Sequence, residues 1–444
     1  MKKALLFLLF ITVAFEGTAQ VAFDSYTSLD ALFEKAKKEK KLVFIQLEST
    51  ECGRCNEVAM MGLESKQLKG KYNVNFLSLK IKATDDLRAD FIKKHKLRES
   101  MGSFYFDANE NLLLKNGITT SDVVTYLDWA DKALENVPKF SNYQDLENIY
   151  RNGDRTAVFL EKYIQALKDL DKDADAVVET YVGQMTIDSL KTPRIITFVI
   201  EQGLPLSAPA RKAIYSLNPD RLTDSLWCLM PLSKRISINN KTISKTFAEA
   251  VKKRNRPLIY ELNNFTRNTY KPDYQKGNYV SELQLINFFK AIRDTTSYFR
   301  TANRFADNLV STKLDTLKAW DNREREKAFS SGDREKRFTV PSGNYATELN
   351  NLSWNYYQIT NNPMHLEKAL KWTEHAILIH KEVVKSNAGQ NAGFFDTYAH
   401  LLYKLQRYDE AIEWQTKAVD AQKAANMKST AFEEEREKMK NRKL

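Results

Sequence analysis

Cysteine, glycine and proline are all scarce in this sequence. Its 444 residues include 3 Cys, 14 Gly and 10 Pro. A small scaffold held together by disulfides would carry more cysteines, so that class is excluded. With few helix breakers and many Lys, Glu, Leu and Ala residues, the composition favours a largely helical protein of two or three domains.

Long apolar runs are also missing after the first residues. Lys2 and Lys3 precede an apolar run at 4–15, and the small residues "GTA" follow at 17–19. The run is shorter than the roughly 20 residues that span a bilayer, and the pattern is typical of a secretory signal peptide at 1–19. We therefore expect cleavage near Ala19, export to the periplasm and no stable membrane insertion. Because no Cys follows the run, we do not expect a lipoprotein.

The formal net charge of +11 comes from Lys and Arg residues that are scattered among Asp and Glu. Such a distribution is typical of solvated helix faces. The chain contains no nucleic-acid-binding motif, so we expect no nucleic-acid partner.

Helix-like and strand-like segments alternate between residues 22 and 136. Apolar periodicity and turn residues predict the following order: helix 28–41, strand 41–47, helix 52–70, strand 72–81, helix 85–97, two strands within 103–117, and helix 120–137. The order predicts an α/β domain.

A Cys-x-x-Cys motif, Cys52-Gly53-Arg54-Cys55, follows the buried strand "KLVFIQL" and opens the next helix. Residues 22–136 resemble the thioredoxin family. The resemblance rests on this motif, on the hairpin "FYFDANENLLLKNG" and on the order of the elements. A CxxC pair at a strand-to-helix junction is typical of that family's redox site. The resemblance implies thiol–disulfide exchange without a soluble cofactor, with electrons supplied by another dithiol protein.

The position of the cysteines assigns them different roles. Cys52 is expected at a helix N-terminus, where free N–H groups favour the thiolate that attacks a disulfide. Cys55 lies one turn further along, faces the domain interior and resolves the mixed disulfide. Arg54 favours the Cys52 thiolate, whereas Glu51 and Glu48 oppose it, and the sequence does not fix the net effect.

Three positions depart from the family's pattern. Glu51 replaces the usual Trp before the first cysteine, and Gln46 replaces a buried Asp that assists proton transfer. Met101 replaces the cis-proline that faces the dithiol. A cis bond before a residue other than proline costs about 3 kcal/mol, so we expect Met101 to follow a trans bond. The sequence leaves open whether Gln46 and Met101 abolish activity.

A zinc site is the alternative use of the cysteine pair. Such a site needs about four ligands, and beyond the pair only Cys228 and five His residues remain, none at a suitable spacing. We therefore expect no bound metal. Cys228 lies among Leu, Trp and Met residues, which predicts a buried structural thiol.

The rest of the chain reads as short amphipathic helices. A polar segment with Pro at 135–142 predicts a linker. We expect an α-helical region at 143–340, and two helical repeats followed by a capping helix at 345–430. The repeats resemble tetratricopeptide units. They align at a constant offset of 42: Ala369 with Ala411, Trp372 with Trp414, and Ala376 with Ala418.

Such an array offers a concave protein-binding surface. Its aromatic residues are more often core than ligand contacts, and we expect this of Trp354, Tyr356, Tyr357, Trp372 and Trp414.

The sequence thus predicts an exported thiol–disulfide oxidoreductase, with a thioredoxin-like domain followed by an all-α helical-repeat region that binds other proteins. The alternative is a non-catalytic binding or assembly module built on a degenerate thioredoxin fold. The intact CxxC motif favours the enzyme, and the changes at Gln46 and Met101 favour the module.

Overall fold

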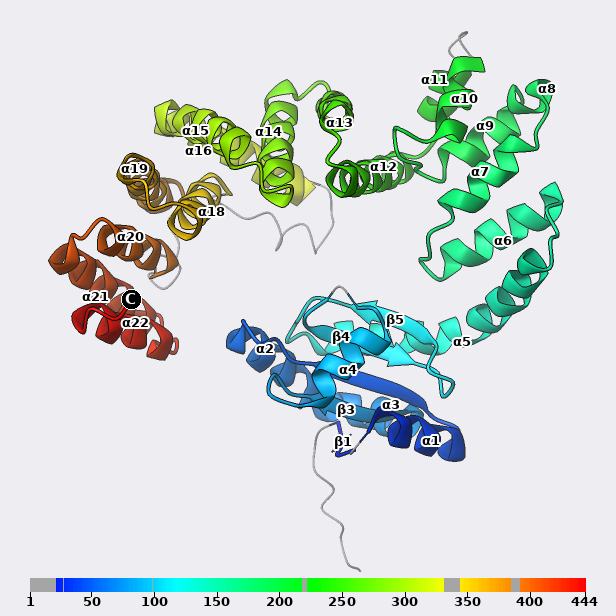
Figure 1. Ribbon diagram of the computed structural model, residues 1–444, viewed down its shortest axis with the longest axis horizontal. Coiled ribbons are helices and arrows are strands. Elements are labelled where there is room, and N and C mark those ends of the chain that lie inside the picture. The colour runs from blue at the N-terminus through cyan, green and yellow to red at the C-terminus, as the bar shows by residue number, and fades with distance from the viewer. Residues whose placement is uncertain (1–20, 27, 98, 218–221, 331–343, 385–391) are drawn as a thin grey trace, which may run out of the picture. The chain divides into compact units, whose positions relative to one another are not determined.

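A computed structural model describes residues 21–26, 28–97, 99–217, 222–330, 344–384 and 392–444 (Figure 1). The chain divides into two compact units, Met1–Ile238 and Asn239–Leu444. The signal peptide expected at 1–19 lies outside the described residues. In the described part of the chain, no helix is both long enough and apolar enough to cross a membrane.

The first unit begins with a five-stranded mixed sheet in the order β1-β3-β2-β4-β5. Strands β1, β3 and β2 are parallel, β4 is antiparallel to β2, and β5 is antiparallel to β4. The strands are Phe23–Asp24 (β1), Leu42–Leu47 (β2), Phe76–Ile81 (β3), Gly102–Phe106 (β4) and Leu112–Asn116 (β5).

Helices cover both faces of this sheet. The helices are Leu29–Glu39 (α1), Gly53–Leu63 (α2), Lys66–Asn75 (α3), Leu87–Lys94 (α4) and Val123–Arg151 (α5). One apolar core joins α1 and α4 to the face of β2 that carries Val43, Ile45 and Leu47. The other joins α2, α3 and α5 to the face that carries Phe44. This alternation along β2 positions Gln46 on the second face, under α2, and confirms the predicted α/β class.

Two predicted elements differ in the structure. The helix expected at 52–70 is two helices, because the Ser65 hydroxyl caps a new one by accepting the N–H of Gln67 at 3.3 Å. The second helix continues past Gly70 into 72–75, where the sequence pattern predicts a strand. Tyr72 is fully buried there, so tertiary packing outweighs the local strand propensity.

The linker predicted at 135–142 is wrong. Helix α5 runs through it without a break and contains Pro138. Phe140 and Tyr143 lie in the core of the first unit, and the buried Asn136 side chain donates a hydrogen bond to the Leu113 carbonyl at 2.9 Å. These contacts compensate for a proline in a helix interior.

Short helices complete the first unit and share one apolar core with the end of α5. The first of them packs on α5, and the others pack on it and on one another (Figure 1). They are Ala157–Asp169 (α6), Asp175–Gly183 (α7), Ile187–Leu190 (α8), Pro193–Ile200 (α9), Pro209–Leu217 (α10) and Leu222–Leu229 (α11). Helix α12, Leu232–Lys253, includes the division between the units.

The second unit is helical throughout its described residues, which confirms the predicted helical region. Its further elements are Arg256–Thr269 (α13), Tyr274–Ala291 (α14), Thr295–Ser311 (α15), Leu314–Ser330 (α16), Asn344–Ile359 (α18), Pro363–Ile379 (α19), His380–Val384 (η1), Ala392–Lys404 (α20), Tyr408–Ala424 (α21) and Thr430–Lys440 (α22).

The predicted repeat corresponds to two helix pairs, in which α18 packs on α19 and α20 packs on α21. The aligned residues Ala369, Ala376, Ala411 and Ala418 are all fully buried. Small side chains at these positions let neighbouring helices approach closely.

Candidate functional site

The loop that follows β2 is closed onto the first turn of α2 by two polar side chains. The buried Ser49 hydroxyl accepts the N–H groups of Glu51 and Cys52, each at 3.1 Å. The Asn56 side chain accepts the N–H of Ser49 at 2.7 Å and donates to its carbonyl at 3.0 Å. This network fixes the loop that carries Cys52.

Cys52 and Cys55 form a disulfide at the start of α2, with their Cα atoms 5.3 Å apart. Cys52 is the residue that caps the helix, and its Sγ accepts the N–H of Cys55 at 3.2 Å. A sulfur in this position also lies at the positive end of the helix dipole, which stabilises a thiolate when the disulfide is reduced. The structure therefore brings the two predicted cysteines together at a helix N-terminus.

Both cysteines are half-buried. Arg54 and Glu51 lie beside them and are exposed. Their charges act on Cys52 through water, where electrostatic effects are weak and screened by salt. A Cβ on Gly53 would meet no atom within 4 Å, so an Ala would fit at this position.

Gln46 is buried, and its side-chain oxygen accepts a hydrogen bond from the Ser103 hydroxyl at 2.7 Å. The two residues are direct neighbours on β2 and β4. A carboxamide held in this way cannot accept a proton. Burial raises the pKa of the nearby Tyr126 to about 12, so this hydroxyl also stays neutral.

Met101 lies immediately before β4, beside the end of β2, because Gly102 pairs with Leu47. Among the described residues, the only cis peptide bond precedes Pro272, so Met101 follows a trans bond, as predicted. Gly102 has a φ of +132°. A Cβ at this position would lie 2.1 Å from the Asn116 carbonyl oxygen, so the turn after Met101 requires glycine.

Arg88, on α4, connects the two loops at this end of the sheet. Its guanidinium donates hydrogen bonds to the carbonyl of Glu48, just after β2, and to the carbonyl of Ser100, just before Met101. No pattern in the sequence indicates this role, since an Arg in an amphipathic helix is usually solvated. Ser49 and Asn56 are not identified from the sequence either, although a Ser side chain that accepts the N–H groups of the next residues is a known turn signal.

Cys228 is exposed, so the prediction that it is a buried thiol is wrong. Leu226 and Trp227 of α11, and Met230 just after it, pack toward the core, while Cys228 and Leu229 face outward. Most of the apolar neighbours in sequence therefore lie on a different side of the chain from Cys228. In the described residues, no group of three or more His, Cys, Asp or Glu side chains is placed to hold a metal ion.

The aromatic residues of the repeats divide into two groups. Tyr356 and Trp372 are core residues, as predicted, and the Trp372 ring nitrogen donates to Asp307 at 3.0 Å. The other three, Trp354, Tyr357 and Trp414, are half-buried.

No model of a known protein family matches the chain, and neither does any characterised protein with which it was compared. The function of the disulfide is therefore inferred from its geometry and chemistry.

Proposed function

We propose that the protein exchanges disulfides with other proteins through Cys52 and Cys55. The observation that supports this most directly is a disulfide at a helix N-terminus whose Cys52 sulfur already accepts a backbone N–H. Its place where β2 meets α2, in a mixed sheet covered by helices, supports a thioredoxin-like fold.

The reaction begins with the reduced dithiol. The Cys52 thiolate attacks one sulfur of a partner's disulfide, forms a mixed disulfide and releases the partner's other sulfur as a thiolate. Cys55 loses its proton and attacks the Cys52 sulfur. The Cys52–Cys55 bond forms, the partner's second sulfur leaves, and two electrons have passed to the partner. A second dithiol protein reduces Cys52–Cys55 again.

The proton of Cys55 passes to water in this scheme. Gln46 cannot accept it, and the Arg88 guanidinium offers only N–H donors. The step is therefore expected to depend on solvent access to the half-buried Cys55. We further propose that the helical repeats recruit or orient the partner protein, and that export through the segment 1–19 takes the protein to the periplasm.

One observation favours the non-catalytic alternative. The Gln46–Ser103 pair replaces the proton acceptor beside the dithiol with a neutral hydrogen bond. In a binding module the disulfide would only hold the start of α2 in shape, and the fold would act as a docking surface.

Trapping the mixed disulfide distinguishes the two hypotheses. All variants carry Cys228→Ser, because the exposed Cys228 thiol would itself form adducts. Cys55→Ser removes the resolving thiol, so a partner protein should remain attached to Cys52 and be released by reductant. Cys52→Ser is the matched control and should trap far less.

Insulin reduction with dithiothreitol as electron source gives the second measurement. The protein with both cysteines should accelerate it, and each single variant should lose this acceleration. No trapped adduct in Cys55→Ser and no acceleration of insulin reduction would refute the enzyme and leave the binding module.

A further inference from the structure

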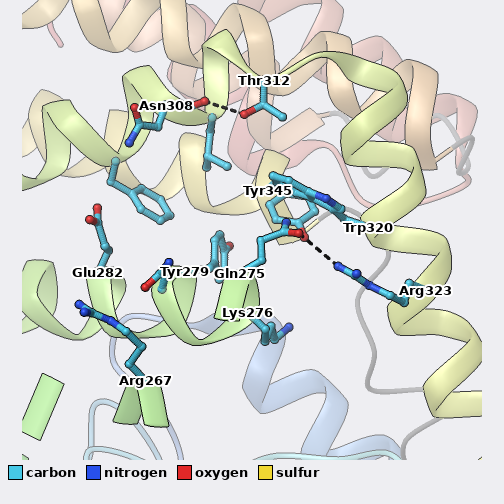
Figure 2. Close-up of a pocket in the computed structure, with 13 residues that line it drawn as sticks. Arg267, Gln275, Lys276, Tyr279, Glu282, Asn308, Thr312, Trp320, Arg323 and Tyr345 are labelled. Carbon is cyan, nitrogen blue, oxygen red and sulfur yellow. Dashed lines mark hydrogen bonds between the residues drawn. The ribbon is translucent and has the colours of Figure 1, made fainter. Parts of the chain in front are cut away.

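The second unit contains a cavity that the sequence did not reveal. It lies between α14 and α15 and is bordered by α16 and the start of α18, as Figure 2 shows. Its volume of about 420 Å³ is in the range of small-molecule binding sites. It contains neither cysteine of the disulfide, so its ligand is a separate question from disulfide exchange.

Aromatic rings form one continuous wall of the cavity. The ring centroid of Tyr279 lies 5.3 Å from that of Phe305 and 5.4 Å from that of Tyr345. Tyr345 in turn lies 5.9 Å from Trp320. These residues come from four different helices, so the wall exists only in the folded unit. A flat aromatic group could pack against it with offset or edge-to-face geometry.

The charges that line the cavity are mainly positive. Its described lining includes Arg267, Lys276 and Arg323 but only one carboxylate, Glu282. Glu282 already pairs with Arg304 at 3.0 Å. The lining therefore has an excess of positive charge, which favours an anionic ligand.

Polar groups at one end are suited to hold such an anion. Arg323 donates to the neutral side-chain oxygen of Gln275 at 3.2 Å, and the Lys276 side chain lies at the same end of the cavity (Figure 2). Beside them, the Tyr279 hydroxyl is buried and has no hydrogen-bond partner among the described residues. Burial raises the pKa of Tyr279, which keeps this hydroxyl a neutral donor. A donor left unsatisfied in this way is costly and is relieved by a ligand acceptor.

We propose that this cavity binds a small organic acid made of one aromatic ring and one carboxylate. The ring packs against Tyr345 and Trp320, and the carboxylate accepts hydrogen bonds from Arg323 and the Tyr279 hydroxyl, with Lys276 adding positive charge. An Arg–carboxylate contact is charge-assisted, and its loss is expected to weaken binding about tenfold.

Isothermal titration calorimetry on the full chain tests this with matched probes. N-acetyl-L-phenylalanine carries the ring and the carboxylate, N-acetyl-L-phenylalaninamide lacks the charge, and N-acetylglycine lacks the ring. The first should bind at least about tenfold more tightly than either of the others. Similar binding of acid and amide, or no binding of the acid at millimolar concentration, would overturn the proposal.

Variants locate the binding. Arg323 is exposed, so Arg323→Gln should fold normally and weaken binding of the acid about tenfold without changing that of the amide. Tyr279→Phe keeps the aromatic wall and should weaken binding of the acid several-fold. Lys371→Gln removes an exposed cation elsewhere in the same unit and should have no effect. Unchanged acid binding in Arg323→Gln would show that the acid binds elsewhere and would also overturn the proposal.

Discussion

Replacing Gly102 by Ala should destabilise the sheet next to the disulfide. Gly102 has a φ of +132°, a conformation almost restricted to glycine, which costs another residue about 1–3 kcal/mol. The new Cβ would also lie 2.1 Å from the Asn116 oxygen and 2.9 Å from the Gly117 Cα. These are backbone atoms, so the strands must shift, at a further cost of about 1–3 kcal/mol. Together we expect a loss of about 2–6 kcal/mol.

Hydrogen exchange measured by mass spectrometry reports this loss locally. Each 1.4 kcal/mol is tenfold in an opening equilibrium. The amides of β4 and β5 should therefore exchange at least about 30-fold faster in Gly102→Ala than in the wild type.

Gly70→Ala is the matched control for this experiment. Gly70 is in helix α3, and a Cβ there meets no atom within 4 Å. Ala at this position should leave the exchange of β4 and β5 unchanged, or stabilise the unit by up to about 1 kcal/mol. The steric argument would be refuted if the amides of β4 and β5 exchanged at the same rate in Gly102→Ala as in Gly70→Ala.

Three further predictions follow from the same unit. Arg88→Lys keeps the charge but cannot donate to the carbonyls of both Glu48 and Ser100, so hydrogen exchange of the amides in the loops that contain these two residues should rise about tenfold. Unchanged exchange would contradict the bridging role of Arg88. Because the pKa of Tyr126 is raised to about 12 in the fold, its contribution to stability is complete below pH 10 and is lost as the pH rises from about 10 to 12. Urea unfolding should show that the free energy of unfolding falls over this pH range, and the fall should be smaller in Tyr126→Phe. Limited proteolysis should leave the segment 135–142 intact, because it is helical and packed; an early cut there would contradict the continuous helix.

The sequence by itself determined the parts of the protein that depend on local pattern. The apolar run "KLVFIQL" predicted a buried strand before the cysteine motif, because a short apolar run bounded by polar residues is typical of a strand in a sheet core. The spacing of Cys52 and Cys55 places them one turn apart at a helix start, which is close enough for a disulfide. The offset of 42 between the two repeats predicted their helix pairs, because alanines at equivalent positions allow equivalent packing.

Only the tertiary structure decided features that depend on contacts between distant residues. Pro138 indicated a boundary, yet burial of Phe140 and Tyr143 keeps the helix continuous. Apolar neighbours predicted burial of Cys228, but its place on the helix surface exposes it. Arg88 reaches Glu48 and Ser100 from a separate helix, and four helices contribute the aromatic wall of the cavity. Residues far apart in the chain become partners only when the fold brings them together, and no local pattern records that distance.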